Sequence, residues 1–366
     1  MIGHGQGAHR SPRRSGAVLA AAVLIGGLLG AVPGTAVGAT GDVGYRDFSY
    51  SGASAPTGQK PESKLWFNDG SWWGVLYSSS LGKWTIYRFD WAANAWSNTG
   101  TVVDPRANTS PDALWDGSKL FITNHMKEAA SGSDMGDKIR RFSYDSSTKT
   151  YSLDSGFPVT LTTGAVETTV IDKDTTGRIW ATWTTANASG GRQTTVTHST
   201  TDTATYITPY VIPVSGAATL SSDDISTLVA YNGKIGVMWS NQNDSTVYFA
   251  IHQDGAGDDA GSWTINNPLS QLGYADDHLN IKSLQADSSG QVFAAVKTSL
   301  NDLGAGASAP LILLLSMDGT GGWHRTTFST VGDNQTRPIV LLDPQHRQLY
   351  MFAAGPCCSG GVIYYK

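Results

Sequence analysis

Residues 64–77 read KLWFNDGSWWGVLY, two runs of β-forming residues joined by an Asp-Gly turn. An Asp-Gly pair between two such runs is a strong hairpin signal. The arrangement recurs along the chain, with successive turns 47 to 60 residues apart. The turns are Asp69-Gly70, Asp116-Gly117, Thr176-Gly177, Asn232-Gly233, Ser289-Gly290 and His346-Arg347. A period of this length in an all-β chain predicts a β-propeller with six blades.

The last repeat is shorter than the others. It supplies strand-like runs at 339–342, 349–352 and 362–365, which is one run fewer than a full blade. Residues 46–50 (RDFSY) also have a strand-like pattern, and they have no local partner. We expect them to complete the last blade and close the ring, which would cover an exposed sheet edge. A seven-bladed ring with one unrecognised blade and a pair of β-sandwiches remain as alternatives.

The first 39 residues resemble a secretory signal peptide. Three arginines precede an apolar run at 17–32, and Val37-Gly38-Ala39 is a small-residue cleavage pattern. The pair Arg13-Arg14 leaves open whether export follows the general or the twin-arginine route. We therefore expect a secreted, extracellular protein whose single propeller domain spans residues 40–366.

The charge of the mature chain limits its partners. Without the three leader arginines, 22 Lys and Arg face 30 Asp and Glu, a net charge of about −8. Such a chain is a poor ligand for nucleic acid or an anionic membrane. We expect a soluble monomer that binds neither.

One hairpin is similar to the Asp-box of sialidase-like propellers. Residues 316–323 read SMDGTGGW, and the Asp-box motif is Ser-x-Asp-x-Gly-x-Thr-Trp. The Ser, Asp and Trp match, but Thr320 stands where the motif has Gly and Gly322 where it has Thr. Residues 259–263 match the motif more weakly. Arg337-Pro338 resembles the arginine motif with which sialidases bind a carboxylate, although the apolar residue between Arg and Pro is missing. The resemblance implies a propeller fold and a carboxylate-binding role for Arg337. It does not settle the activity.

Polar side chains stand where each innermost strand is expected to begin. In a propeller these positions meet near the axis, where ligands usually bind. Two of the three glutamates in the chain, Glu62 and Glu167, occupy matching positions in blades one and three. The positions at strand starts are Glu62, Asp112, Glu167, Asp224, His278 with Asn280 and Lys282, and Arg337; those at the ends of second strands include Asn124, His125, Asn241 and Lys297.

These residues predict one composite site with acidic and basic halves. The basic half, with Arg337 and Lys282, could hold an acidic sugar such as a uronate. Glycoside hydrolysis would need two carboxyls, for which Glu167 and Asp224 are the first pair and Asp112 the third candidate. Lyase chemistry would need a base such as His278 or His125 beside a cation. Each of these groups could instead only make local hydrogen bonds.

Two tryptophans and two cysteines complete the predicted site. Trp183 and Trp239 end second strands in the same register and could stack on a sugar ring, or they could fill space between blades. The only cysteines, Cys357 and Cys358, are adjacent, and in an exported protein we expect them to form a vicinal disulfide beneath the ligand. Calcium binding by the carboxylates stays open, since no Asp-x-Asp-x-Asp loop specifies it.

The sequence thus predicts a secreted carbohydrate-active protein with an axial site for an acidic or polyhydroxylated glycan. A glycoside hydrolase and a polysaccharide lyase are the two enzymatic hypotheses. A lectin-like propeller without turnover and an extracellular protein-binding scaffold are the alternatives. A lectin would tend to repeat one motif in every blade, whereas these residues differ from blade to blade.

Overall fold

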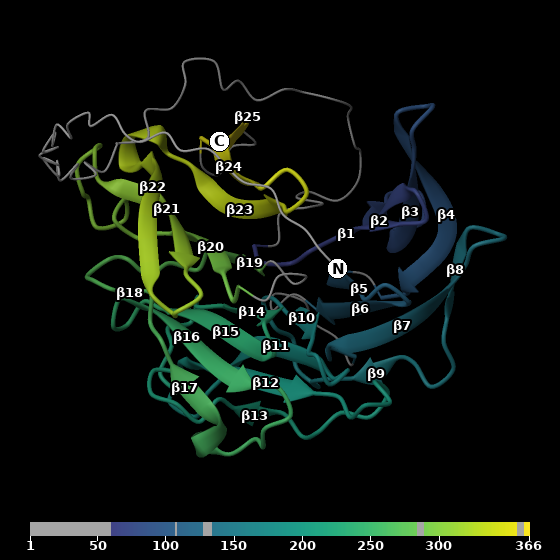
Figure 1. Cartoon of the computed structure of the whole chain (residues 1–366), viewed down its shortest axis with the longest axis horizontal. Helices are drawn as coiled ribbons and strands as arrows, with labels where there is room; N and C mark the ends of the chain where they lie inside the picture. Colours follow the sequence, from purple (N-terminus) through teal and green to yellow (C-terminus); the bar gives the residue numbers. More distant parts are fainter. Residues whose placement is uncertain (1–59, 107, 127–133, 284–288, 357–361) are drawn as a thin grey trace, which may run out of the picture. The chain divides into compact units, whose positions relative to one another are not determined.

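The computed structural model describes residues 60–366, except 107, 127–133, 284–288 and 357–361. It confirms an all-β propeller with six sheets, each arranged as a blade (Figure 1). The described residues contain no α-helix and only two short 3-10 turns. No helix in this part of the chain is long and apolar enough to cross a membrane.

The strands of each blade follow one another in sequence and pair antiparallel. Blade one contains β1 (Leu65–Asn68), β2 (Ser71–Ser78), β3 (Lys83–Asp90) and β4 (Ala95–Asp104). Blade two contains β5 (Thr109–Trp115), β6 (Lys119–Met126), β7 (Lys138–Asp145), β8 (Thr150–Leu153) and the short β9 (Val159–Thr160). Blade three contains β10 (Val170–Lys173), β11 (Ile179–Ala186), β12 (Arg192–His198) and β13 (Tyr210–Val211).

The other three blades repeat this order. Blade four contains β14 (Ser226–Tyr231), β15 (Lys234–Asn241), β16 (Thr246–Gln253), β17 (Trp263–Ile265) and the short β18 (Leu269–Ser270). Blade five contains β19 (Leu279–Ser283), β20 (Val292–Lys297), β21 (Pro310–Met317) and β22 (Trp323–Thr330). Blade six contains β23 (Thr336–Asp343), β24 (Gln348–Gly355) and β25 (Val362–Tyr365).

The predicted turns join the two inner strands of their blades. At Asp69-Gly70 the φ angles are 50° and 72°, and at Asn232-Gly233 they are 41° and 71°. Two successive residues with positive φ are the geometry of the tight hairpin turn that Asp-Gly and Asn-Gly favour. The turns therefore set the register of the innermost strands.

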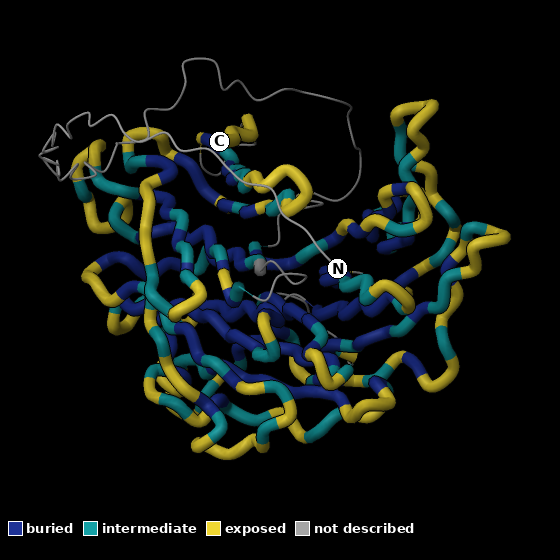
Figure 2. The backbone as a smooth tube through the Cα atoms, viewed as in Figure 1, coloured by how far each residue is buried: buried dark blue, intermediate teal, exposed yellow. Residues whose placement is uncertain are grey.

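Apolar residues pack between neighbouring blades. In blades two, three and four most residues of the two inner strands are buried, on both faces of the sheet, as the dark stretches of Figure 2 show. Five hydrophobic clusters lie between blades one and two, two and three, three and four, four and five, and five and six. Within the described residues, no such cluster joins blade six to blade one.

The Asp-box-like hairpin is a turn held by its aspartate. One oxygen of Asp318 accepts hydrogen bonds from the amides of Thr320 and Gly322, both at 2.9 Å. The indole of Trp323 donates to the carbonyl of Asn266 at 3.1 Å. These contacts fix the β21–β22 connection and give it no chemistry of its own.

Several predictions fall on residues outside the described part of the chain. These are the signal peptide at 1–39, the closing strand at 46–50, and the vicinal disulfide of Cys357 and Cys358. They stay predictions.

Candidate functional site

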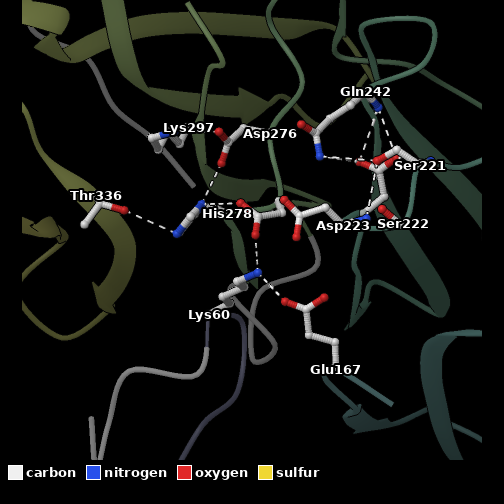
Figure 3. Close-up of polar contacts among 12 residues, drawn as sticks. Lys60, Glu167, Ser221, Ser222, Asp223, Gln242, Asp276, His278, Lys297 and Thr336 are labelled. Carbon is white, nitrogen blue, oxygen red and sulfur yellow. Dashed lines mark hydrogen bonds and ion pairs between the residues drawn. The ribbon is translucent and has the colours of Figure 1, made fainter. Parts of the chain in front are cut away.

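Charged side chains from four blades meet where the innermost strands begin (Figure 3). We call this group the polar mouth. Its members come from the segments before β1, β10, β14 and β19, from the end of β20 and from the start of β23: Lys60, Glu167, Asp223, Asp276, Asp277, His278, Lys297 and Thr336.

Three carboxylates of the polar mouth gather around one lysine. One oxygen each from Glu167, Asp223 and Asp277 lies within 4.8 Å of the others. The ammonium group of Lys60 donates hydrogen bonds to Glu167 and to Asp277. Lys60 has a backbone φ of 40°, a left-handed conformation that is uncommon for a residue with a side chain. The chain thus places this cation between two carboxylates at a conformational cost.

The carboxylates of the polar mouth have pKa values shifted in opposite directions. Burial raises the pKa of Glu167, and the neighbouring charges of Asp277 and Asp223 add to this against the effect of Lys60. Burial and the charge of Asp277 likewise raise the pKa of Asp223. Burial would also raise the pKa of Asp277, but the hydrogen bond and charge of His278 and the charge of Lys60 together lower it.

His278 is held on both sides of its ring. Its Nδ1 lies 2.6 Å from a carboxylate oxygen of Asp276 and 2.6 Å from one of Asp277. Its Nε2 lies 3.2 Å from the hydroxyl of Thr336. Burial would lower the pKa of His278, but the hydrogen bonds and charges of the two aspartates raise it. The ring is therefore oriented with Nδ1–H toward the carboxylates and is biased toward its protonated form.

Asp276 links this histidine to a second cation. Its other carboxylate oxygen accepts a hydrogen bond from Lys297 at 2.5 Å, and both side chains are buried. A buried carboxylate with two charged partners has little freedom to reorient. Asp276 and Lys297 therefore support His278 from behind the polar mouth.

The same carboxylates are the chain's candidate ligands for a cation. Glu167, Asp223 and Asp277 could each supply one oxygen, as calcium prefers. The ammonium of Lys60 already contacts two of them, so a divalent ion would have to displace it. Calcium therefore stays an open prediction.

The structure brings three of the sequence-predicted site residues together, namely Glu167, His278 and Lys297. Arg337 is exposed and directly follows Thr336, whose hydroxyl contacts His278. Its φ of 52° coincides with a register shift between Thr336 and Ile339. Arg337 thus lies in a strained β-bulge beside the polar mouth.

Asp224 differs from its predicted role as the partner of Glu167. Its carboxylate is buried and accepts hydrogen bonds from the backbone amides of Ser221 and Gln242 at 2.7 to 3.2 Å. It therefore stabilises the turn before β14. The preceding residue, Asp223, is the one that lies beside Glu167.

Asp112 is buried on β5 and lines the axial cavity instead of joining the polar mouth. Its carboxylate accepts hydrogen bonds from the amides of Ser63 and Ile171 and so ties blade two to blades one and three. Burial raises its pKa to about 7. Asp172 and Asn280 make matching bonds to the next inner strand, to Ala230 and Val340. Asp112 is thus one of a set of side chains that join neighbouring blades.

Glu62 and His125 form a buried ion pair rather than a ligand site. His125 is fully buried, with Nε2 at 2.5 Å from Glu62 and Nδ1 at 2.8 Å from the carbonyl of Val166. Both ring nitrogens face acceptors, and although burial would lower the pKa of His125, the charge and hydrogen bond of Glu62 raise it, which favours the protonated ring. Lys64 and Ser110 also donate to Glu62.

Four further predicted residues do not reach the polar mouth. The Trp183 and Trp239 side chains are buried in the cores between blades, where Trp239 stacks on Tyr248, so neither is accessible to a sugar ring. Asn241 donates to Gly216 and Asp244 in a turn. Asn124 is also fully buried. Of the two roles that the sequence left open for these tryptophans, the structure supports packing between blades.

Lys282 lines a separate cavity of about 860 Å³ that runs along the axis and between blades one and six. Its ammonium donates to the hydroxyl of Ser63 at 2.8 Å. Burial lowers its pKa, which the charges of Asp112 and Asp172 partly restore. Lys282 therefore faces this cavity and not the carboxylates of the polar mouth.

Five residues of the polar mouth were missed by reasoning from the sequence: Lys60, Asp223, Asp276, Asp277 and Thr336. A signal was present in the two acidic pairs Asp223-Asp224 and Asp276-Asp277, each just before an inner strand. Counting back from the turns selected Asp224 from the first pair and, beside the second pair, His278 instead of either aspartate. The conformation of each loop decides which side chains join the polar mouth. No comparable pattern marks Lys60.

No family model matches this chain, and no curated protein matches its sequence. Among solved structures, it is similar to a periplasmic gluconolactonase of Pseudomonas aeruginosa, with 13% identity, 77% of each chain covered and a TM-score of 0.45. It is also similar to a GH43_1 enzyme from Xanthomonas citri, with 13% identity, 76% of this chain and 93% of that chain covered, and a TM-score of 0.41. The polysaccharide lyase Uly1 matches at 10% identity, with 87% and 91% covered and a TM-score of 0.41.

These similarities are too distant to indicate the chemistry of the site. They give no sialidase assignment either. The function of the chain is inferred from its own residues.

Proposed function

We propose that the protein is a secreted glycoside hydrolase that cleaves an acidic or polyhydroxylated glycan in the polar mouth. The observation that carries this proposal is the pairing of Glu167 with Asp277. The pKa of Glu167 is raised and that of Asp277 is lowered, although the two carboxylates lie within 4.8 Å of each other. Opposite shifts in one site are the arrangement that assigns an acid and a base.

Glu167 would protonate the glycosidic oxygen because it holds its proton at a higher pH than an ordinary glutamate. Asp277 would stay ionised and either attack the sugar or stabilise the positive charge that develops on it. Retaining enzymes hold their two carboxyls roughly 5 to 5.5 Å apart, and inverting enzymes roughly 6.5 to 9.5 Å apart. The approach of Glu167 to Asp277 favours retention of configuration.

Lys60 has to leave the space between the two carboxylates when a sugar binds there. In the structure its ammonium contacts both of them. Hydroxyl groups of the sugar can replace these hydrogen bonds, and Asp223 offers the displaced ammonium a third carboxylate nearby. Lys60 would thus keep Asp277 ionised before substrate arrives.

The cations beside the polar mouth favour a substrate with a carboxylate. Arg337 is exposed, and no hydrogen bond or ion pair of its guanidinium occurs within the described residues. A guanidinium binds a carboxylate through two parallel hydrogen bonds. A uronic acid next to the cleaved bond would fit this requirement.

Lyase chemistry is the second candidate function. His278 contacts Thr336, which directly precedes Arg337 at the β-bulge, so a possible base lies near a cation. A lyase needs an unprotonated base and a cation that neutralises the substrate's carboxylate. The raised pKa of His278 works against the first requirement. Hydrolysis is therefore favoured.

The test is a panel of neutral and acidic polysaccharides incubated with the mature protein. We expect new reducing ends without unsaturated uronates on at least one acidic polysaccharide. Asp277→Asn should abolish this release, while Asp302→Asn, an exposed loop substitution in blade five, should leave it unchanged. Unsaturated products would indicate a lyase, and binding without any product would indicate a lectin; both outcomes contradict the proposal.

A further inference from the structure

The boundary between blades one and six differs from the other five boundaries. Each of the others holds a buried hydrophobic cluster. At this one the described residues line a cavity of about 860 Å³ with apolar walls. We call it the blade six–one cleft, lined among others by Leu65, Trp72, Trp91, Leu341 and Phe352.

The walls of this cleft expose large apolar side chains. Leu65, Trp72 and Trp91 of blade one are 46%, 40% and 59% exposed, and Leu341 of blade six is 47% exposed. Water-exposed aromatic surface of this extent is unusual in a soluble protein and indicates that something covers it.

Blade six also has an unpaired strand edge. Its outermost described strand, β25, pairs only with β24, and all four of its residues are exposed. Lys366 exchanges backbone hydrogen bonds with Met351 on β24. Because alternate residues of a strand face opposite sides, the amides of Ile363 and Tyr365 point away from β24. Those amides need a partner strand or water.

We propose that residues 40–59 of the same chain occupy the blade six–one cleft, with residues 46–50 pairing against the free edge of β25. The described part of the chain begins at Lys60, and the next residue, Pro61, lines the cleft. The segment therefore reaches the cleft without crossing another blade.

The length of the segment fits this assignment. The nine residues between Tyr50 and Lys60 span up to about 30 Å when extended. A fourth strand of blade six lies about 15 Å from the innermost strand, since adjacent strands are about 4.8 Å apart. The tether is thus long enough.

The sequence of the segment fits the chemistry of the cleft. Phe48 and Tyr50 stand two residues apart and would share one face of a strand, while Asp47 and Ser49 share the other. The aromatic face matches the exposed tryptophans of blade one, and the polar face suits solvent. A second copy of the chain could also cover the edge, but it would have to displace this tethered segment, whose effective concentration is high.

Hydrogen exchange of the C-terminal peptide of the mature chain tests this proposal. We expect the amides of Ile363 and Tyr365 to exchange at least about tenfold more slowly than amides of an unpaired strand edge. Phe48→Asp and the milder Tyr50→Ser should remove the protection and lower the melting temperature. Ser49→Asp, on the polar face, should change neither.

Three outcomes would overturn the proposal. The first is unprotected exchange at β25 in the unchanged mature chain. The second is equal behaviour of Phe48→Asp and Ser49→Asp. The third is protection that appears only at concentrations where light scattering detects a dimer, which would assign the edge to a second copy.

Discussion

Asp223 of the polar mouth and its neighbour Asp224 have different roles because the loop before β14 turns their side chains in different directions. Asp224 is buried and bonded to backbone amides, whereas Asp223 is exposed and lies beside Glu167 and Asp277. Both residues are aspartates, so the sequence does not distinguish them. The pair thus shows that a residue type and its approximate position are predictable, while the direction of a loop side chain is not.

Exchanging each aspartate for asparagine separates the two roles. Asp224→Asn weakens three hydrogen bonds to a buried carboxylate and should lower the free energy of unfolding by about 1 to 3 kcal/mol. Asp223→Asn should leave the unfolding free energy unchanged and lower kcat. Denaturant melts and steady-state kinetics on both variants check this, and the reverse pattern would contradict the assignment.

Removing the lysine between the carboxylates should move the pH dependence of the reaction. The charge of Lys60 lowers the pKa of both Glu167 and Asp277. In Lys60→Met both pKa values rise, so both limbs of the bell-shaped profile of kcat/KM should shift to higher pH. A profile that keeps its position would show that Lys60 does not act on these groups.

At the level of elements, a buried ion pair fastens the start of β1 to β6. Glu62 lies just before β1 and contacts His125 on β6, and both are fully enclosed. The sequence marked both residues as polar groups at blade ends, which is correct. Their use for stability rather than ligand binding follows from neighbours that only the folded chain brings together, such as the carbonyl of Val166.

Breaking this pair should cost stability. Glu62→Gln leaves His125 and Lys64 without a charged partner and should lower the free energy of unfolding by about 3 to 5 kcal/mol, as for other buried pairs. Asp69→Asn, which removes an exposed pair with Lys149, should produce no comparable loss. Equal effects of the two substitutions would contradict the role of Glu62.

The same pair predicts how stability depends on pH. The pKa of Glu62 is lowered, against burial, by Lys64 and His125, so its contribution is present above about pH 4.3 and is lost as the pH falls through the folded value. The pKa of His125 is raised, against burial, by Glu62, so its contribution is present below about pH 6.5 and is lost as the pH rises through the folded value. Glu62→Gln should flatten both slopes in melts recorded across this range.

For the whole molecule, the repeat of tight turns was sufficient to predict six blades around an axis. Turns such as Asp69-Gly70 and Asn232-Gly233 carry their own geometry, so the sequence reports them directly. The site was predicted in part, because convergence at the axis follows from the fold. For Trp183 and Trp239 the sequence left sugar stacking and core packing both open, because a regular register at strand ends is the same for side chains that face a ligand and for side chains that pack between blades. Their burial in the structure supports core packing.

The central claim is that Glu167 acts as the acid and Asp277 as the ionised partner in glycoside cleavage. The most direct measurement is kcat of Glu167→Gln on the cleaved glycan and on an aryl glycoside with a good leaving group. The account predicts a loss of about 10²- to 10⁴-fold on the glycan and a much smaller loss on the aryl glycoside, which needs no proton from an acid. A glycan kcat equal to that of the unchanged protein would contradict it.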